Sequence, residues 1–232
     1  MRTALIAGAS GLVGGHLLDC LLATRHRVFA LVRKPLDKQH PRLEQITVNF
    51  ERIDRADLPV VGDVFCTLGT TIRTAGSEDA FRRVDLDYPR MLAERYAARG
   101  AGQFLLVSSV GADLKSGNFY LRTKGELEQA VSKLPIPAVH IFRPSFLEGD
   151  REQKRGAESA GIALARALQF ALLGGLRKYR PVAAQTVAAA IDQAAVENKP
   201  GRCIYHYDDI LRLAASRVAA PAPMVRAAGA PV

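Results

Sequence analysis

The sequence has few of the residues that hold small secreted proteins together. It contains only three cysteines in 232 residues, Cys20, Cys66 and Cys203, and their odd number and lack of paired spacing exclude a disulfide framework. We therefore expect reduced core thiols and a cytoplasmic location. Tryptophan is absent and aromatic residues make up 6% of the chain. These aromatics are not interleaved with the basic residues as the stacking platforms of a nucleic-acid binder would be.

Long apolar runs and metal signatures are also missing. The most apolar long stretch, 160–176, contains Arg166 and Gln169, which predicts a buried helix rather than a membrane span. The apolar residues after Met1-Arg2 end at a glycine loop, unlike a secretory signal. The histidines do not share the spacing of metal ligands, and no HExxH, CxxC or Walker pattern occurs. We expect no metal.

Basic residues outnumber acidic ones and give a formal net charge of +9. They are scattered along the chain, and the densest excess, in 151–180, has seven basic residues against two acidic ones. Such an excess favours an anionic small molecule or is simply a solvated basic face. We expect a small-molecule substrate as the partner, with nucleic acid and membranes disfavoured. The oligomeric state is left open.

Short apolar runs alternate with segments of helical periodicity. This alternation predicts parallel crossovers and a Rossmann-like, doubly wound, mainly parallel sheet of about seven strands with helices on both faces. Residues 1–215 form the predicted domain, with a small substrate-side extension at about 146–180, and 216–232 are expected to be a disordered tail. The expected strands are 3–7, 27–32, 46–50, 63–68, 103–108, 136–142 and 202–205, and the expected helices are one beginning at 12 and 81–99, 119–134, 156–173, 184–196 and 208–215.

The first expected strand ends in GASGLVG, a glycine-rich loop that leads directly into a helix. Gly8 allows the tight turn, Gly11 has no side chain to keep a pyrophosphate from the backbone, and Gly14 lets the helix approach the sheet. The free amides at the helix start then favour phosphate. A plain glycine-rich turn is the alternative, but the position between strand and helix favours nucleotide binding.

Arg33 and Lys34 follow the second expected strand, where dinucleotide-binding folds select their cofactor. An acid at this place holds the ribose 2′-hydroxyl of NAD, whereas an arginine accommodates the 2′-phosphate of NADP. Here the first acid is Asp37, beyond a proline. We therefore expect NADP, with NAD as the second choice and an exposed basic turn as the alternative.

Tyr120 and Lys124 form a Tyr-x-x-x-Lys motif on an expected helix. Side chains at this spacing share one face of the helix, and an ammonium beside a phenol favours the phenolate that acid–base chemistry needs. Ser108 and Ser109 end the preceding strand, where a hydroxyl can bind the oxygen of a reacting carbonyl. The motif is common by chance and the serines also suit a turn, but together these features favour hydride chemistry.

The chain contains, in this order between residues 8 and 151, the segments GASGLVG, LVR, CTLGTT, LLVSSVGA, YLRTKGELE and FRPSFLEGDR, and the resemblance that they carry covers about residues 2–214. In this order they resemble an atypical short-chain dehydrogenase/reductase, in particular the Tat-interacting-protein-like branch of NAD(P)-binding oxidoreductases. The resemblance implies an NADP-binding Rossmann domain in which Tyr120 is the acid/base. Lys124 tunes the tyrosine and holds the ribose. Ser109, with Ser108 in reserve, supplies the hydroxyl.

The resemblance also implies a set of cofactor-binding residues at the ends of the strands. They comprise Gly8, Ser10, Gly11, Leu12, Val13, Gly14, Arg33, Lys34, Asn49, Phe50, Thr67, Leu68, Gly69, Ser108, Lys124 and Pro144.

Two departures from the family pattern shape the functional hypothesis. Many dehydrogenases place an asparagine on the helix after the fourth strand, but this chain offers only Asp85 and Asp87 there, so we assign the role to neither. Only about 70 residues of this sequence follow the sixth expected strand, fewer than the large C-terminal lobe of extended sugar epimerases has, so we expect a bulky nucleotide-sugar substrate less than a small one. The main hypothesis is an NADP-dependent oxidoreductase acting on a small carbonyl or alcohol. The alternatives are an epimerase or isomerase with retained cofactor and an NADP-binding redox sensor.

Overall fold

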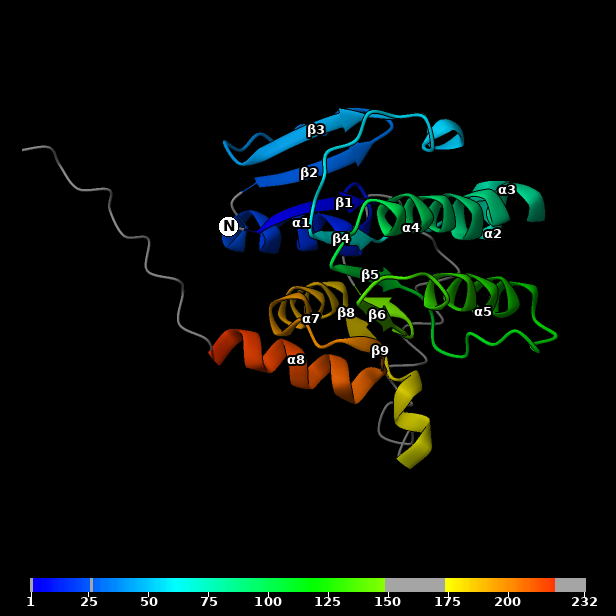
Figure 1. The fold of residues 1–232 in the computed structure, drawn as a ribbon. Coiled ribbons are helices and arrows are strands. Elements are labelled where there is room, and N and C mark those ends of the chain that lie inside the picture. Colours follow the sequence, from blue (N-terminus) through cyan, green and yellow to red (C-terminus); the bar gives the residue numbers. More distant parts are fainter. Residues whose placement is uncertain (1, 26, 149–173, 220–232) are drawn as a thin grey trace, which may run out of the picture.

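A seven-stranded parallel sheet forms the centre of the computed structural model, which describes residues 2–25, 27–148 and 174–219. The strand order is β3-β2-β1-β4-β5-β6-β9, so the chain starts in the middle and winds outward in both directions (Figure 1). This order confirms the predicted Rossmann-like fold. The strands are β1 (Thr3–Ala7), β2 (Arg27–Val32), β3 (Leu43–Thr47), β4 (Asp63–Cys66), β5 (Gln103–Val107), β6 (Ala138–Phe142) and β9 (Gly201–Tyr205).

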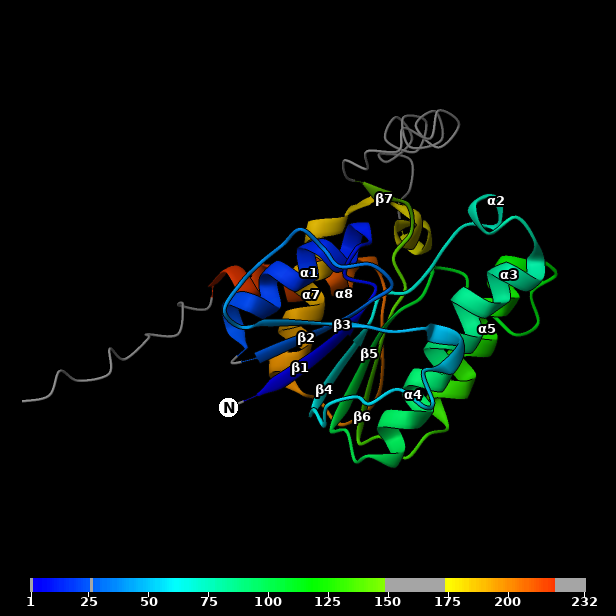
Figure 2. The same cartoon turned by 90° about the horizontal axis from the view of Figure 1, so that it is seen from above.

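Helices cover both faces of the sheet (Figure 2). One face carries α1 (Leu12–Thr24), α7 (Ala184–Glu197) and α8 (Tyr207–Ala219), and the other carries α3 (Glu78–Arg82), α4 (Tyr88–Ala98) and α5 (Phe119–Ser132). The inner strands are apolar on both sides because each face packs against helices, and the two faces hold two separate core clusters. The loops and helices that carry the predicted site residues are therefore supported by a sheet that helices cover on both faces.

The third strand lies earlier in the chain than predicted. We expected a strand over 46–50, but β3 covers Leu43–Thr47 and pairs along its length with β2. Asn49 then accepts a hydrogen bond from the amide of Glu51 and starts a 3-10 turn, η1 (Phe50–Arg52). Phe50 turns into the core at the point where the apolar pattern suggested a continuing strand.

The expected long helix 81–99 is interrupted. It starts earlier, as α3, and passes through a π-helical turn, η2 (Arg83–Asp87), before α4. Helical turns of this wider type are rare and occur mainly at functional sites. A short helix, α2 (Ile72–Ala75), precedes α3 and was not predicted.

The C-terminal part of the described chain also differs from expectation. A small parallel sheet of β7 (Leu147–Glu148) and β8 (Val182–Ala183), with a 3-10 helix η3 (Gly174–Tyr179), lies near the carboxyl end of β6 (Figure 2). The expected helix 156–173 lies outside the described residues. The disordered tail expected from residue 216 was placed too early in the chain, because α8 continues to Ala219. Arg217 contacts buried Asp192 at 2.9 Å. Residues 220–232 of that tail are likewise outside the described part.

Candidate active site

The glycine loop between β1 and α1 has a geometry that only glycine allows at two positions. Gly8 has a φ of +96°, and a Cβ there would lie 2.6 Å from Thr67. A Cβ at Gly14 would lie 2.0 Å from the carbonyl oxygen of Gly8. These contacts agree with the predicted roles of Gly8 in the turn and Gly14 in the approach of the helix to the sheet.

The start of α1 is open to a ligand. Gly11 is the N-cap residue and has no side chain that could cap the helix, and the first turn contains no acid. Ser10 and Gly11 are exposed, whereas the side chain of Val13 is buried in the core, and Leu12 is partly buried against it. Val13 can thus serve a phosphate only through its backbone, and the loop presents amides with the positive end of the helix.

Arg33 and Lys34 lie directly after β2, and both are exposed. Within the described residues, neither makes an ion pair or a hydrogen bond through its side chain. Burial and the Glu51 carboxylate raise the pKa of Tyr88, while Arg83 and Arg33 oppose this shift. Arg33 therefore lies near Tyr88, on the side of the sheet where Phe50 packs against the Tyr88 ring at 5.7 Å.

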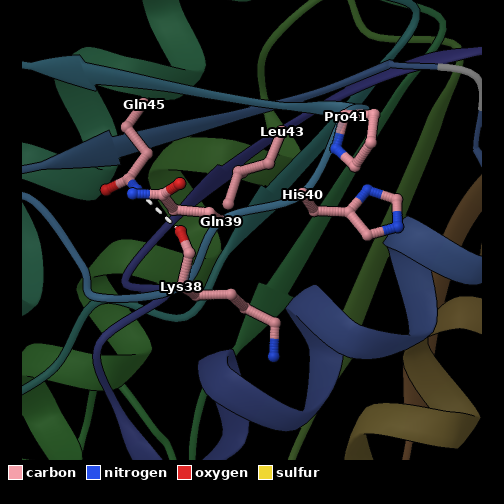
Figure 3. Close-up of a pocket in the computed structure, with 6 residues that line it drawn as sticks. All are labelled: Lys38, Gln39, His40, Pro41, Leu43 and Gln45. Carbon is pink, nitrogen blue, oxygen red and sulfur yellow. Dashed lines mark hydrogen bonds between the residues drawn. The ribbon is translucent and has the colours of Figure 1, made fainter.

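The chain after Arg33 and Lys34 is anchored by Gln45 of β3. Its Oε1 accepts from the amide of Leu36 at 2.7 Å, and its Nε2 donates to the carbonyl oxygens of Leu36 and Lys38. Figure 3 shows the contact between Gln45 and Lys38. These two residues, with residues 39–41 and Leu43, line an open hollow of about 630 Å³. The hollow contains none of the predicted site residues.

The loop after β4 lies next to the glycine loop, at the carboxyl ends of β4 and β1. Thr67 donates from both its amide and its hydroxyl to the carbonyl oxygen of Ala7, which ties β4 to the end of β1. Leu68 is half-buried and Gly69 is exposed. A Cβ at Gly69 would lie 3.4 Å from Oδ1 of Asp85, so this loop passes close to the helix that follows it.

Lys124 of α5 is almost completely buried and forms an ion pair with Asp85. Its Nζ lies 2.6 Å from Oδ1 of Asp85, whose own side chain is 1% exposed. Oδ2 of Asp85 accepts from the amide of Thr70 at 2.7 Å. Burial lowers the pKa of Lys124, but the Asp85 carboxylate and, to a lesser degree, Tyr120 outweigh it and raise the pKa overall. Lys124 is therefore a stable cation.

Tyr120 is half-buried at the start of α5 and packs against α3. Its ring centroid lies 5.6 Å from that of Phe81, which also contacts Phe119 at 5.7 Å. Phe81 is fully buried, so it fixes the first turn of α5. The sequence spacing thus correctly placed Tyr120 and Lys124 on one helix, and packing sets the position of the phenol.

The two serines after β5 have different environments. The hydroxyl of buried Ser108 donates to Oε1 of Glu128 at 2.5 Å, and its amide donates to the carbonyl oxygen of Phe142. Arg143 holds the same carboxylate with contacts of 3.0 and 3.2 Å from Nε. The hydroxyl proton of Ser108 is therefore engaged in a buried network, so its implied role in binding the cofactor stays a prediction.

Ser109 keeps its hydroxyl free for other partners. It is half-buried, and within the described residues its hydroxyl makes only a long contact of 3.4 Å to the carbonyl oxygen of Val110. The amide of Val110 donates to the carbonyl oxygen of Pro144 at 2.9 Å. The segments carrying Ser109 and Pro144 are therefore held together, as a site at the ends of β5 and β6 requires.

Three features of the site were missed at the sequence level. Asp85 was only a candidate, and the Glu128–Arg143 pair was not noticed, although Glu128 continues the helical spacing of Tyr120 and Lys124. Gly125 was also missed. A Cβ there would lie 2.5 Å from the backbone of Asp113, so this glycine lets α5 pack against the loop that follows Ser109.

The glycine loop, the loop after β4, Ser109 and Pro144 all follow the carboxyl ends of parallel strands. Lys124 of α5 reaches the loop after β4, because its Nζ would lie 3.9 Å from a Cβ at Gly69. In folds of this kind, ligands bind at this edge of the sheet.

The sequence profile of the NAD dependent epimerase/dehydratase family matches residues 4–113. The protein HTATIP2 of Rattus norvegicus is 39% identical over 164 residues, which cover 68% of this chain and 67% of the relative.

The chain belongs to this NAD-dependent epimerase/dehydratase family, in its HTATIP2-like branch. The expected branch is thus confirmed. A fungal member, the protein FMP52, mitochondrial, of Debaryomyces hansenii, is 33% identical over 159 residues, covering 66% of this chain and 70% of the relative. The human epimerase family protein SDR39U1, solved with NADPH, has the same fold with a TM-score of 0.61 at 16% identity, covering 88% of this chain and 74% of that structure. Within the described residues, no helix is long and apolar enough to cross a membrane.

Proposed function

We propose that this protein is an NADP-dependent oxidoreductase that transfers hydride to or from a small carbonyl or alcohol. The observation that carries the proposal is that Tyr120 and Lys124 share α5, which packs at Gly125 against the loop that follows Ser109. Membership of the epimerase/dehydratase family supports a nucleotide cofactor but does not by itself specify oxidoreduction.

The residues present fit a nicotinamide dinucleotide. The first turn of α1, which no side chain caps, offers backbone amides for the pyrophosphate. Lys124 has two N–H groups left beyond its bond to Asp85 for the ribose hydroxyls. When bound, the dinucleotide supplies or accepts the hydride. Tyr120 gives a proton to the carbonyl oxygen, or takes one from the alcohol, and the Ser109 hydroxyl donates a hydrogen bond to the same oxygen.

The preference for NADP rests on Arg33 and Lys34. Both side chains are exposed and lack ionic partners among the described residues, so a 2′-phosphate would meet two free cations there. An exposed turn of this kind is less suited to NAD, because no carboxylate stands at the end of β2 to accept from the 2′-hydroxyl.

The Tyr120→Phe variant tests the acid/base role. We expect NADPH affinity close to wild type, because the ring is kept, and a turnover lowered roughly 10²-fold or more against a panel of small aldehydes and ketones. Tyr207→Phe, at the start of α8 on the other side of the sheet, is the control and should retain turnover. A Tyr120→Phe variant with wild-type turnover would show that another group supplies the proton.

A second candidate, an epimerase with retained cofactor, is favoured by the family to which the chain belongs. Such an enzyme returns the hydride to its substrate and keeps the dinucleotide between turnovers. Mass spectrometry of the purified protein distinguishes the two, because an epimerase should copurify with stoichiometric cofactor and a dehydrogenase should exchange it freely. A redox sensor would bind NADPH without any turnover, and the intact Tyr120–Lys124 pair argues against it.

The partner and the location complete the proposal. We propose a small-molecule substrate as the partner. Of the expected substrate-side extension at 146–180, residues 149–173 lie outside the described part of the chain. A cytoplasmic location is proposed from the reduced cysteines. The name of the fungal relative includes the word mitochondrial, so fractionation of cells expressing the tagged protein is the direct test.

A further inference from the structure

The Asp85–Lys124 pair is the most deeply buried ion pair close to the proposed chemistry. The two side chains are 1% and 4% exposed, and they join the π-helical turn 83–87 to the middle of α5. Asp85 also fixes the loop after β4, because its second oxygen accepts from the amide of Thr70. One carboxylate therefore links three segments that surround the site.

The charge on Lys124 depends on this carboxylate. The titratable groups acting on Lys124 are Asp85 from the π turn, Tyr120 from its own helix and Cys66 from the end of β4. Burial raises the pKa of the Cys66 thiol to about 12, so it stays neutral and offers no counter-charge. A buried lysine without a counter-ion loses its proton much more easily than one in water. Asp85 is thus the only carboxylate among these groups, and its Oδ1 lies 2.6 Å from the Lys124 ammonium.

We propose that Asp85 is the positioning residue of this site: it keeps Lys124 protonated, directs its ammonium group and couples it to the loop of Thr67–Thr70. The proposal rests on the proposed function, because it assigns to Lys124 the binding of the cofactor ribose. Asp85 thus occupies the helix after β4, where the family pattern has an asparagine, but it acts through a direct ion pair with the lysine.

This arrangement predicts how the ammonium is used. One of its three N–H groups points to Asp85, which leaves two for the ribose hydroxyls. Replacing Asp85 by asparagine keeps the size and an oxygen acceptor but removes the charge. Burial then acts on Lys124 without an opposing carboxylate, and the lysine should lose its proton within the working pH range. Its loss should weaken dinucleotide binding as the pH rises.

The experiment follows NADPH binding by fluorescence from pH 7 to pH 9.5 in four proteins: wild type, Asp85→Asn, Asp87→Asn and Lys124→Met. Asp87 is the matched control, because it is an acid in the same π turn that is not paired with Lys124.

We expect the NADPH affinity of the wild type and of Asp87→Asn to stay constant over this pH range. In Asp85→Asn, affinity should fall as the pH rises, by up to about tenfold for each pH unit above the pKa of Lys124, because binding then requires the uptake of one proton. In Lys124→Met it should be weak at every pH. A flat profile in Asp85→Asn at wild-type affinity overturns the proposal.

Melting temperatures of the apo proteins supply an independent test that needs no cofactor. Lys124→Met leaves the Asp85 carboxylate buried without its cation, so it should melt below the Asp85→Asn/Lys124→Met double variant, in which no charge is left. A double variant that melts no higher than Lys124→Met overturns the proposal, even if Asp85→Asn fails to fold. If wild type does not bind NADPH at all, the proposed function is wrong, while the melting comparison still decides whether Asp85 holds Lys124.

Discussion

The hydroxyl of Ser108 donates a hydrogen bond to Oε1 of Glu128 at 2.5 Å, inside a network closed by Arg143. This bond separates two adjacent serines that the sequence alone could not distinguish. Ser108 holds α5 against the ends of β5 and β6, whereas within the described residues the hydroxyl of Ser109 makes only a long contact to Val110. Under the proposed function, the Ser109 hydroxyl is the one that binds the substrate oxygen.

Ser109→Ala should therefore reduce turnover roughly 10²- to 10³-fold, the usual effect of removing a donor to a reacting oxygen, with little change in melting temperature. Ser108→Ala should instead destabilise the fold by about 1–3 kcal/mol, because the buried Glu128 carboxylate loses a donor. Steady-state kinetics and chemical denaturation of both variants make the comparison. Loss of turnover in a stable Ser108→Ala variant, with Ser109→Ala active, would reverse the assignment.

The glycine loop offers a pair of neighbouring positions with opposite expectations. A methyl group at Gly14 would meet the carbonyl oxygen of Gly8 at 2.0 Å, whereas one at Gly15 has its nearest neighbour, the carbonyl oxygen of Ala9, at 3.7 Å. Gly14→Ala should displace the loop and lower NADPH affinity at least about tenfold, since overpacking costs roughly 1–3 kcal/mol. Gly15→Ala should bind normally and melt slightly higher, because alanine favours the helix.

Calorimetric titration with NADPH, together with thermal melting, measures both effects. Wild-type affinity in Gly14→Ala would show that the loop does not form the phosphate site.

Sequence patterns predicted most of the fold because the inner strands are apolar on both faces and the helices have clear periodicity. They failed where long-range contacts decide the local structure. The position of β3 is set by its pairing with β2, which ends at Thr47. Val48 and Phe50, which suggested a longer strand, are buried in the core instead. The π turn is linked to Asp85, which is held from two distant segments. Local periodicity carries no signal for such contacts.

The candidate site was predicted in part for the same reason. The glycines and the Tyr120–Lys124 pair act over a few residues, and their spacing is visible in the sequence. Arg143 lies at the end of a different strand from Ser108, so its link to Glu128 exists only after folding. Gly125 was missed because its close contact is with the backbone of Asp113, in a loop that the helical pattern does not describe.

Cofactor choice depends on Arg33 in this account. A guanidinium can bind two oxygens of a 2′-phosphate, and charge-assisted hydrogen bonds contribute about 1.5–3 kcal/mol each. Arg33→Ala should therefore weaken NADP binding roughly 10- to 1000-fold and leave NAD binding almost unchanged. Arg27→Ala is the control, since Arg27 is an exposed arginine at the amino end of the same strand, paired with Glu44.

The measurement is a titration of wild type, Arg33→Ala and Arg27→Ala with NAD and with NADP. Lys34→Ala, titrated in the same way, shows how much of the NADP affinity comes from Lys34. Equal affinities of the wild type for NAD and NADP would contradict the assignment.

Acid stability should depend on His140 in the middle of β6. Burial lowers the pKa of His140 to about 4, and its Nδ1 is hydrogen-bonded to the Tyr205 hydroxyl at 2.9 Å. In the unfolded chain the pKa returns to about 6.5, so only the unfolded state takes up the proton between these values. The free energy of unfolding should fall by up to about 3 kcal/mol as the pH drops from 7 to 4.

Urea denaturation at several pH values tests this dependence. His140→Gln should show a weaker fall in stability over this range than wild type, whatever its stability at pH 7. His16→Gln is the control, because His16 is not among the buried residues of α1. Its free energy of unfolding should depend on pH as that of the wild type does. An unchanged slope in His140→Gln would mean that other groups cause the acid sensitivity.

The transfer of deuterium from NADPH tests the central claim most directly. The protein is incubated with NADPH deuterated at both positions of nicotinamide C4 and with a panel of small aldehydes and ketones, and the products are analysed by mass spectrometry. An oxidoreductase of the proposed kind should place one deuterium on the carbinol carbon of a product alcohol, and Tyr120→Phe should lose this transfer while still binding NADPH. Tight binding of NADPH without transfer of label to any carbonyl of the panel would contradict the account.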